Sequence, residues 1–161
     1  MKSLHDYILN ASIIGLSKQN SDGSFCPGFN GPYNDKETPV RNSAHWIFLL
    51  LKSYELTADI KFKSSAEKAL DYLMSLECRP KGYAMFCRDV PENPLKDECN
   101  GLMGQAWAIE SILEAGIKLE RQDAVLYAND IYNSHYFDEQ KSIWHRLSVD
   151  GEIMSPDATF N

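Results

Sequence analysis

The feature that most constrains this sequence is an alternation between two kinds of helical segment. Five segments repeat apolar residues three and four positions apart, which is the period of a helix with one buried face. Two of them, which begin near Ser43 and at Leu102, are apolar almost all round, whereas the segments at 62–73 and from Asp123 carry polar residues on one face. A helix that is apolar on most sides has to be covered by neighbours. The pattern therefore predicts buried helices that alternate with half-exposed ones.

The connections between these segments also alternate in length. Short turns at 57–60 and near 118–121 join the second segment to the third and the fourth to the fifth. Long stretches at 19–42 and 78–100 separate the other pairs, and residues 136–161 follow the last helix. Antiparallel helices connected in this way place all three long stretches at one end of a helical layer. Because loops on a rigid scaffold usually carry the binding residues, we expect functional residues at that end.

Shorter signals mark the two ends of the fold. Ser3 and Asp6 are expected to cap a first helix whose apolar stripe begins at Leu4. Near the other end, Asp150-Gly151 lies between two alternating runs, which is typical of a β-hairpin at residues 142–154. A length of 161 residues suits one domain. We therefore predict an all-α domain of helical hairpins, residues 1–161, with a small β-hairpin near its C-terminal end.

Composition and charge exclude several classes of protein. The 16 basic and 23 acidic residues give a net charge of −7, which disfavours a nucleic-acid or anionic-membrane surface. The longest apolar run, residues 46–51, is far shorter than the roughly 18–20 residues of a membrane span. The amino-terminal residues lack the apolar segment of a signal peptide, so we expect a cytoplasmic protein with reduced cysteines. We also expect no cofactor and no bound metal.

A weak internal repeat of about 60 residues relates the two buried helices. Asn42 and Asn100 stand just before them, Trp46 and Trp107 stand within them, and Asn161 lies a similar distance beyond Asn100. Repeating helical hairpins of this length, with long loops leading into buried helices, resemble the α/α toroid enzymes. The resemblance implies a partial toroid, with about two and a half of six hairpins.

One segment makes this resemblance more specific. Gly104-Gln-Ala-Trp-Ala-Ile109 is similar to a G-Q-A-W-A motif of unsaturated glucuronyl hydrolases, and the architecture also resembles the N-acylglucosamine 2-epimerases and other six-hairpin glycosidases. In the hydrolases, two acidic residues shortly before the motif match Asp97 and Glu98 here, whereas the arginine that usually precedes the motif is Met103. The resemblance implies action on a sugar or a uronide, with Asp97 and Glu98 as the catalytic residues.

The long-loop end carries the other residue types that a sugar site needs. Aromatic faces stack on sugar rings, polar groups bind hydroxyls, and an arginine can bind the carboxylate of a uronide. If one of Asp97 and Glu98 is the general acid/base, the hydrolase chemistry would hydrate the double bond of an unsaturated uronic acid. An epimerase would instead use His45 and His145 as its acid and base. A small carbohydrate ligand is expected to contact Arg41, His45, Arg88, Gln105, Trp107 and His145.

Structural roles compete with these functional ones. Asp97 and Glu98 suit the first turn of a helix, where the helix dipole favours acidic residues. Gln105 could bind a loop carbonyl, and Arg41 could pair with Glu37. With those roles the chain would be a non-catalytic helical-repeat module that binds a glycan or another protein.

A second resemblance suggests a zinc protein as a further alternative. Gln19-x-x-Asp22-Gly-Ser-Phe25 is similar to the Gln/aromatic repeats of triterpene cyclases and protein prenyltransferase β-subunits, which form another toroid superfamily. Asp97-Glu-Cys99 also has the D-x-C form of two prenyltransferase zinc ligands. This resemblance implies a zinc-dependent prenyltransferase-like or terpene cyclase-like protein.

The buried helix that begins at Leu102 predicts a partner. It needs cover on both flanks, and the sequence stops at Asn161, where a third buried helix would begin. An open flank of several hundred Å² exceeds what soluble monomers normally expose. We therefore expect a homodimer through the open end of the partial toroid, with two-fold symmetry, or a fragment whose missing part completes core and site. In either case the isolated monomer would lack full activity.

Overall fold

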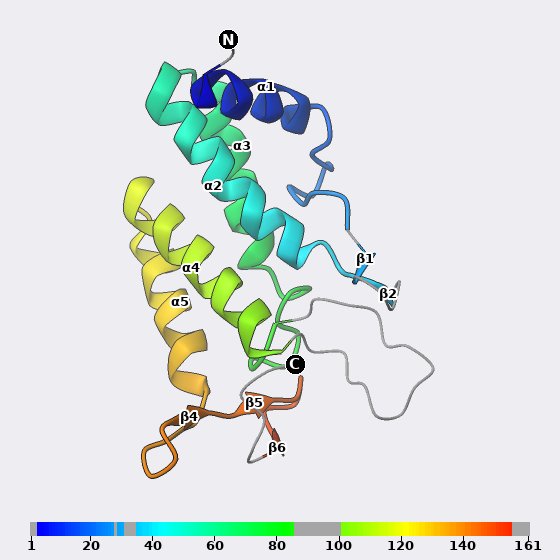
Figure 1. Ribbon diagram of the computed structural model, residues 1–161, viewed down its shortest axis with the longest axis vertical. Helices are drawn as coiled ribbons and strands as arrows, with labels where there is room; N and C mark the ends of the chain where they lie inside the picture. The colour runs from blue at the N-terminus through cyan, green and yellow to red at the C-terminus, as the bar shows by residue number, and fades with distance from the viewer. Residues whose placement is uncertain (1–2, 28, 31–34, 86–100, 156–161) are drawn as a thin grey trace.

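The computed structural model describes residues 3–27, 29–30, 35–85 and 101–155 (Figure 1). In the first helix the predicted cap is present, because the Ser3 hydroxyl accepts from the Asp6 amide N–H and the Asp6 carboxylate accepts from the Ser3 amide N–H. All five segments with a helical pattern are helical. Over the described residues the helices are α1 (Leu4–Leu16), α2 (Val40–Thr57), α3 (Ile60–Leu73), α4 (Leu102–Lys118) and α5 (Gln122–Ser134).

Short strands flank the helices. The described residues form three antiparallel pairs: β1 (Phe29–Asn30) with β2 (Asp35–Lys36), β3 (Phe137–Asp138) with β4 (Ile143–Trp144), and β5 (Arg146–Leu147) with β6 (Ile153–Ser155). The β5–β6 pair confirms the hairpin predicted near 142–154, and its connection contains Gly151, whose φ of +85° suits a glycine. The sequence does not predict the β3–β4 pair, because strands of two residues are too short to show alternation.

The helices pack as two antiparallel hairpins with α1 added at one side. α2 packs against α3, α4 packs against α5, and α2 and α4 lie side by side (Figure 1). α3 also contacts α4, while α1 contacts α2 and α3. The ends at which α2 and α4 begin lie toward the labelled strands in Figure 1. The predicted all-α fold of helical hairpins is therefore confirmed, and closure into a toroid stays a prediction.

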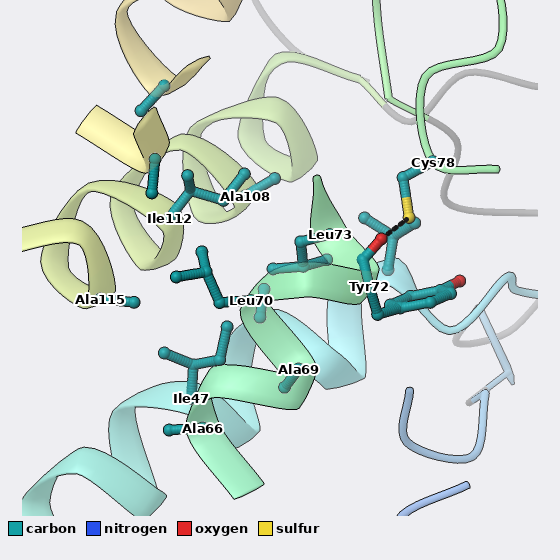
Figure 2. Packing of buried hydrophobic residues seen from close by; sticks show 14 of the residues in the cluster. Ile47, Ala66, Ala69, Leu70, Tyr72, Leu73, Cys78, Ala108, Ile112 and Ala115 are labelled. Carbon is teal, nitrogen blue, oxygen red and sulfur yellow. Dashed lines mark hydrogen bonds between the residues drawn. The ribbon is translucent and has the colours of Figure 1, made fainter. Parts of the chain in front are cut away.

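The core lies between α2, α3 and α4 (Figure 2). Leu70 and Leu73 of α3 lie among side chains of α2 and α4 that include Ile47 and Ile112, and all four are fully buried. Burial of a side chain of this size contributes about 1.5–3 kcal/mol. Between these larger side chains, α3 and α4 present small ones: Ala66, Ala69, Ala108 and Ala115. Small residues let helices approach closely, so this core fixes α4 against α3.

Cys78 packs against the core just after α3. Its thiol donates to the Tyr72 carbonyl over 3.3 Å (Figure 2), and burial raises the pKa of the thiol to about 11. The side chain is therefore a protonated thiol that packs as a small apolar group. Cys26 is exposed, and Cys26 and Cys78 both carry free thiols. Cys87 and Cys99 lie outside the described residues.

Small residues bring α1 close to α2. The Ser53 hydroxyl donates to the Ser12 hydroxyl oxygen over 2.7 Å. Gly15 lies so close to the Trp46 ring that a Cβ at this position would be 2.3 Å from it. The same ring stacks on Phe25, with the ring centroids 5.0 Å apart. Trp46 is therefore a packing residue that holds α1 and its following loop against α2.

Gln19 fastens the loop after α1 to α3. Its amide nitrogen donates to the carbonyls of Gly23 and Ser65 over 2.9 Å each, and its amide oxygen accepts from the Ser65 hydroxyl over 2.7 Å. The Asp22 carboxylate accepts from the amide and the hydroxyl of Ser24, which stabilises the turn. In this structure the Gln19-x-x-Asp22-Gly-Ser-Phe25 segment therefore attaches a loop to a helix.

We predict that Gly23→Ala lowers the free energy of unfolding by more than about 2 kcal/mol. Gly23 has a φ of +92°, and a Cβ there would lie 2.2 Å from the backbone carbonyl oxygen of Lys68. Gly82→Ala is the matched control, because Gly82 has a φ of +79° and a Cβ there would meet no atom within 4 Å. The control should cost only about 1 kcal/mol. Urea unfolding measures both losses, and equal losses would contradict the role of the contact.

Candidate functional site

His45 and Trp107, both predicted to contact a ligand, meet where α2 and α4 begin. Each lies in the second turn of its helix, and the two helices lie side by side. Their ring centroids are 5.1 Å apart, with the planes tilted by 59°. His45 is exposed and Trp107 is half-buried, so part of this pair remains in contact with solvent. An imidazole beside an indole offers a polar and an apolar surface to the same ligand.

Arg41 lies one helical turn before His45 and pairs with Glu37. The guanidinium approaches the Glu37 carboxylate to 2.5 Å, and only 4% of the Glu37 side chain is exposed. A buried carboxylate needs a charged partner. Arg41 therefore has the structural role that its spacing of four residues from Glu37 suggests, as the partner of that carboxylate. The Arg41 side chain is 25% exposed, so the protein does not enclose it completely.

The surroundings of His45 favour a neutral ring at neutral pH. Packing removes part of the ring from water and lowers its pKa below the ordinary value, and the positive charge of Arg41 lowers the pKa further. The charge of Glu110, three residues after Trp107 on α4, acts in the opposite direction. A neutral imidazole can donate and accept hydrogen bonds, as a sugar hydroxyl requires, and can take up a proton from a substrate.

Gln105 fastens the second long loop to α4. Its side chain is buried, its amide oxygen accepts from the Met85 backbone N–H over 2.8 Å, and its amide nitrogen donates to the Met85 carbonyl over 2.9 Å. The arrangement resembles that of Gln19, because in both cases a glutamine holds backbone groups of a loop. These hydrogen bonds support the structural role of Gln105, in which it binds a loop carbonyl. Its role in binding a ligand stays a prediction.

His145 lies between β4 and β5 and is buried. Its backbone N–H donates to the Tyr136 carbonyl over 2.9 Å, and its ring lies 5.2 Å from the Tyr136 ring. Nε2 of the imidazole is 3.8 Å from the nearer Asp138 carboxylate oxygen. These contacts fix the segment between the two C-terminal hairpins. A role for His145 in binding a ligand stays a prediction.

A groove of about 460 Å³ opens on a different face of α4 from Trp107. Side chains of α4, of the last turn of α5 and of the β3–β4 hairpin form its walls, which are mainly apolar. The Trp144 ring packs between Tyr132 and Phe137, with centroid distances of 5.1 and 5.0 Å. The groove is lined by Leu102, Met103, Gln105, Ala106, Ile109, Tyr132, His135, Ser142, Ile143 and Trp144.

The sequence interpretation misses two charged residues that matter for the site. Glu110 acts on His45, and its signal is an acidic residue near the middle of a helix that is mainly apolar. Arg79 is buried after α3, donates to the Tyr83 carbonyl and to the Asp130 carboxylate of α5, and lies 5.3 Å over the Tyr127 ring. Arg79 joins the second long loop to α5, and it lies in no periodic segment that could have revealed it.

The other predicted site residues, Arg88, Asp97 and Glu98, lie outside the described residues. Their roles stay predictions, and so does the alternative zinc set that includes Cys99. Across 3–27, 29–30, 35–85 and 101–155, no three His, Cys, Asp or Glu residues gather closely enough to hold a metal ion. Over the same ranges, no helix has the length and apolar character needed to cross a membrane.

Comparison with known proteins gives one informative similarity. No protein-family model matches the chain, and no solved structure matches it. The chain is similar to the archaeal glycosylation protein Q of Haloferax volcanii. The two sequences are 45% identical over 161 residues, which cover all of this chain and 43% of the relative. The chain therefore spans less than half of the length of that protein.

We predict that Gln105→Leu lowers the free energy of unfolding by about 2 to 4 kcal/mol, because it removes two buried hydrogen bonds from the Met85 backbone. Gln122→Leu, at an exposed position of α5, is the control and should change stability by less than about 0.5 kcal/mol. Thermal and urea unfolding measure both effects. If Gln105 served only to contact a ligand, the two variants would be equally stable.

We predict that the pKa of His45, measured by NMR titration of its ring protons, lies below the ordinary value of about 6.5. Glu110→Gln should lower this pKa further, because it removes the charge that favours the imidazolium. Glu114→Gln is the control, since Glu114 pairs with Lys118 one turn along α4.

The lowered pKa of His45 also makes the free energy of unfolding depend on pH. Because the unfolded chain binds more protons at His45 than the folded chain, the contribution of this group to folding falls as the pH drops through the ordinary histidine pKa. A His45 pKa above the ordinary value would contradict the effects of burial and of Arg41 on this ring.

Proposed function

We propose that this chain takes part in carbohydrate metabolism and binds a sugar or a uronide at the ends of α2 and α4. The first support is the similarity to archaeal glycosylation protein Q, which extends over the whole chain at 45% identity. The second is the α/α-toroid resemblance, which the helical hairpins agree with. In this proposal the chain corresponds to the N-terminal part of a toroid hydrolase or epimerase.

The contact between His45 and Trp107 is the observation that carries the proposal. The indole provides a flat apolar surface for the C–H face of a sugar ring. The neutral imidazole beside it can exchange hydrogen bonds with a hydroxyl, and the exposed part of Arg41 can bind a carboxylate. Together, these three groups suit a uronide better than a neutral sugar.

Catalysis in this proposal belongs to Asp97 and Glu98. They precede α4 by a few residues in the sequence, and α4 carries Trp107 in its second turn. To hydrate the double bond of an unsaturated uronide, one carboxylic acid would give a proton to one carbon while a carboxylate takes a proton from the water that attacks the other. In the epimerase alternative, His45 and His145 would exchange protons at the two faces of the ring.

The alternative function is a non-catalytic module that binds a glycan or a protein. Two observations favour it over an enzyme, because Gln105 and Arg41 already have protein partners, in the Met85 backbone and the Glu37 carboxylate. In this case the His45–Trp107 pair would still contact a glycan, and the proposed binding site would be unchanged. Turnover separates the two functions.

We predict that Trp107→Leu and His45→Gln each weaken binding of glucuronic acid or an unsaturated glucuronide at least about tenfold, which corresponds to about 1.4 kcal/mol. Isothermal titration calorimetry measures the affinity, with N-acetylglucosamine as a second probe. Trp144→Leu is the control, because Trp144 lines the separate groove beside α4. Equal losses in all three variants, or wild-type affinity in the first two, would contradict the site.

Turnover of the unsaturated uronide gives the second part of this test. Asp97→Asn and Glu98→Gln should abolish turnover, which is measured as the decrease in absorbance of the substrate's double bond. Both variants should leave the binding affinity and the thermal midpoint nearly unchanged. Binding without turnover in the unmodified protein would favour the module. A large loss of stability in the two variants would instead indicate that these carboxylates cap α4.

A further inference from the structure

The groove beside α4 lies next to the His45–Trp107 pair. Met103 forms part of the groove wall and is 55% exposed. It precedes Trp107 by four positions on α4, and residues at this spacing are neighbours on a helix surface, with Cβ atoms about 5–6 Å apart. The groove and the pair both lie at the end where α4 begins, toward the C-terminal strands (Figure 1). A group attached to a sugar on Trp107 therefore has to pass only Met103 to enter the groove.

The groove has the size and the walls of a small-molecule site. Its volume of about 460 Å³ lies within the range of about 300–1,000 Å³ that is usual for such sites. Apolar side chains of α4 line one side, and the rings of Tyr132 and Trp144 line the other. The Trp144 ring packs between Tyr132 and Phe137, so its position is fixed before a ligand arrives. A fixed aromatic wall lowers the entropy cost of binding an apolar group.

The described walls of the groove carry no positive charge. None of their residues is a lysine or an arginine, and their one basic side chain is that of His135. Nδ1 of His135 lies 2.8 Å from the Ile131 carbonyl oxygen, which can only accept, so Nδ1 carries the hydrogen. Burial lowers the pKa of this ring below the ordinary value and outweighs the hydrogen bond to Ile131. The imidazole is therefore neutral at neutral pH.

Negative charge stands beside the groove on the same helix. Glu110 is exposed and follows Met103 by seven positions, which is about two turns, so the two residues share a face of α4. The whole chain carries a net charge of −7. A second uronate or a phosphate in the groove would meet these negative charges without a cation in the described walls. Charge and wall chemistry both favour an occupant that is apolar and uncharged.

We propose that the groove binds an uncharged apolar group that is attached to the sugar. The substrate class is then an alkyl or aryl uronide, and an acidic oligosaccharide is excluded. The sugar ring lies on Trp107, and the apolar group lies beyond Met103, against Ala106 and Trp144. This inference rests on the proposed function, because it places the sugar at the His45–Trp107 pair, and it adds the chemistry of the group to which the sugar is linked.

Isothermal titration calorimetry with matched ligands tests the substrate class. Phenyl glucuronide should bind at least about tenfold more tightly than glucuronic acid, because its benzene ring leaves water on entering the groove. Digalacturonic acid places a second uronate where the benzene ring would lie, and it should bind no more tightly than galacturonic acid. Equal affinities for phenyl glucuronide and glucuronic acid would overturn the proposal, and so would a tenfold gain for digalacturonic acid.

Ala106→Trp tests the position of the apolar group, because an indole at this position fills the groove. It should remove the tenfold advantage of phenyl glucuronide and leave the affinity for glucuronic acid unchanged. Gln122→Trp is the matched control, since it places the same side chain at the start of α5, whereas the groove lies beside the last turn of that helix. Both positions are exposed, so circular dichroism should show that both variants fold. An advantage that survives Ala106→Trp would overturn the proposal.

The uncharged fluorescent probe N-phenyl-1-naphthylamine tests the groove without the sugar site. The probe should bind the unmodified chain and Trp107→Leu equally, and Ala106→Trp should abolish its binding. If Trp107→Leu leaves the affinity for glucuronic acid unchanged while the probe still binds, the proposed function is wrong and this inference falls with it. If Trp107→Leu weakens binding of glucuronic acid but the probe does not bind, only this inference is overturned, and the groove is covered by other polypeptide.

Discussion

The packing of α2 beside α4 is the contact on which the rest of the structure depends. Leu70, Leu73 and the alanines of α3 pack against both helices. The two helices begin at the same end of the molecule. That common end brings His45 to Trp107 and places Arg41 one turn away. Any change that moved α4 along α2 by a single turn, about 5.4 Å, would separate the imidazole from the indole. The candidate site is therefore only as well defined as this helix pair.

Much of the fold can be read from the sequence because its signals are local and repeated. Apolar periodicity is continuous over three or more turns in every helix, the Ser3–Asp6 cap lies within four residues, and Asp150-Gly151 marks its own turn. The same reasoning gives neither β1–β2 nor β3–β4, because a two-residue strand depends on its partner rather than on its own pattern. Arg79 is missed for a similar reason, since its buried place depends on Asp130, about fifty residues away in the sequence.

The candidate site is only partly accessible to such reasoning. Residue type and loop position place His45 and Trp107 at the same end of the helical layer, where the structure brings their rings together, and spacing suggests the pair of Arg41 with Glu37. Sequence cannot decide between Gln105 as a ligand contact and Gln105 as a partner of the Met85 backbone, because a buried amide would satisfy its hydrogen bonds equally well in both. It also cannot show that Glu110 influences His45, because that effect crosses from one helix to another.

Gln19 and Gln105 attach their loops through main-chain groups, and this has a consequence for how the protein can change during evolution. Gln19 binds the carbonyl of Gly23, and Gln105 binds the N–H and carbonyl of Met85. At position 85 every residue type except proline presents both groups, so a substitution there keeps the anchor, whereas the close contact of Gly23 with Lys68 restricts the other loop to glycine at its anchor. Descendants of this chain could acquire new ligand preferences by substitution in the loops while the helices beneath them stay the same.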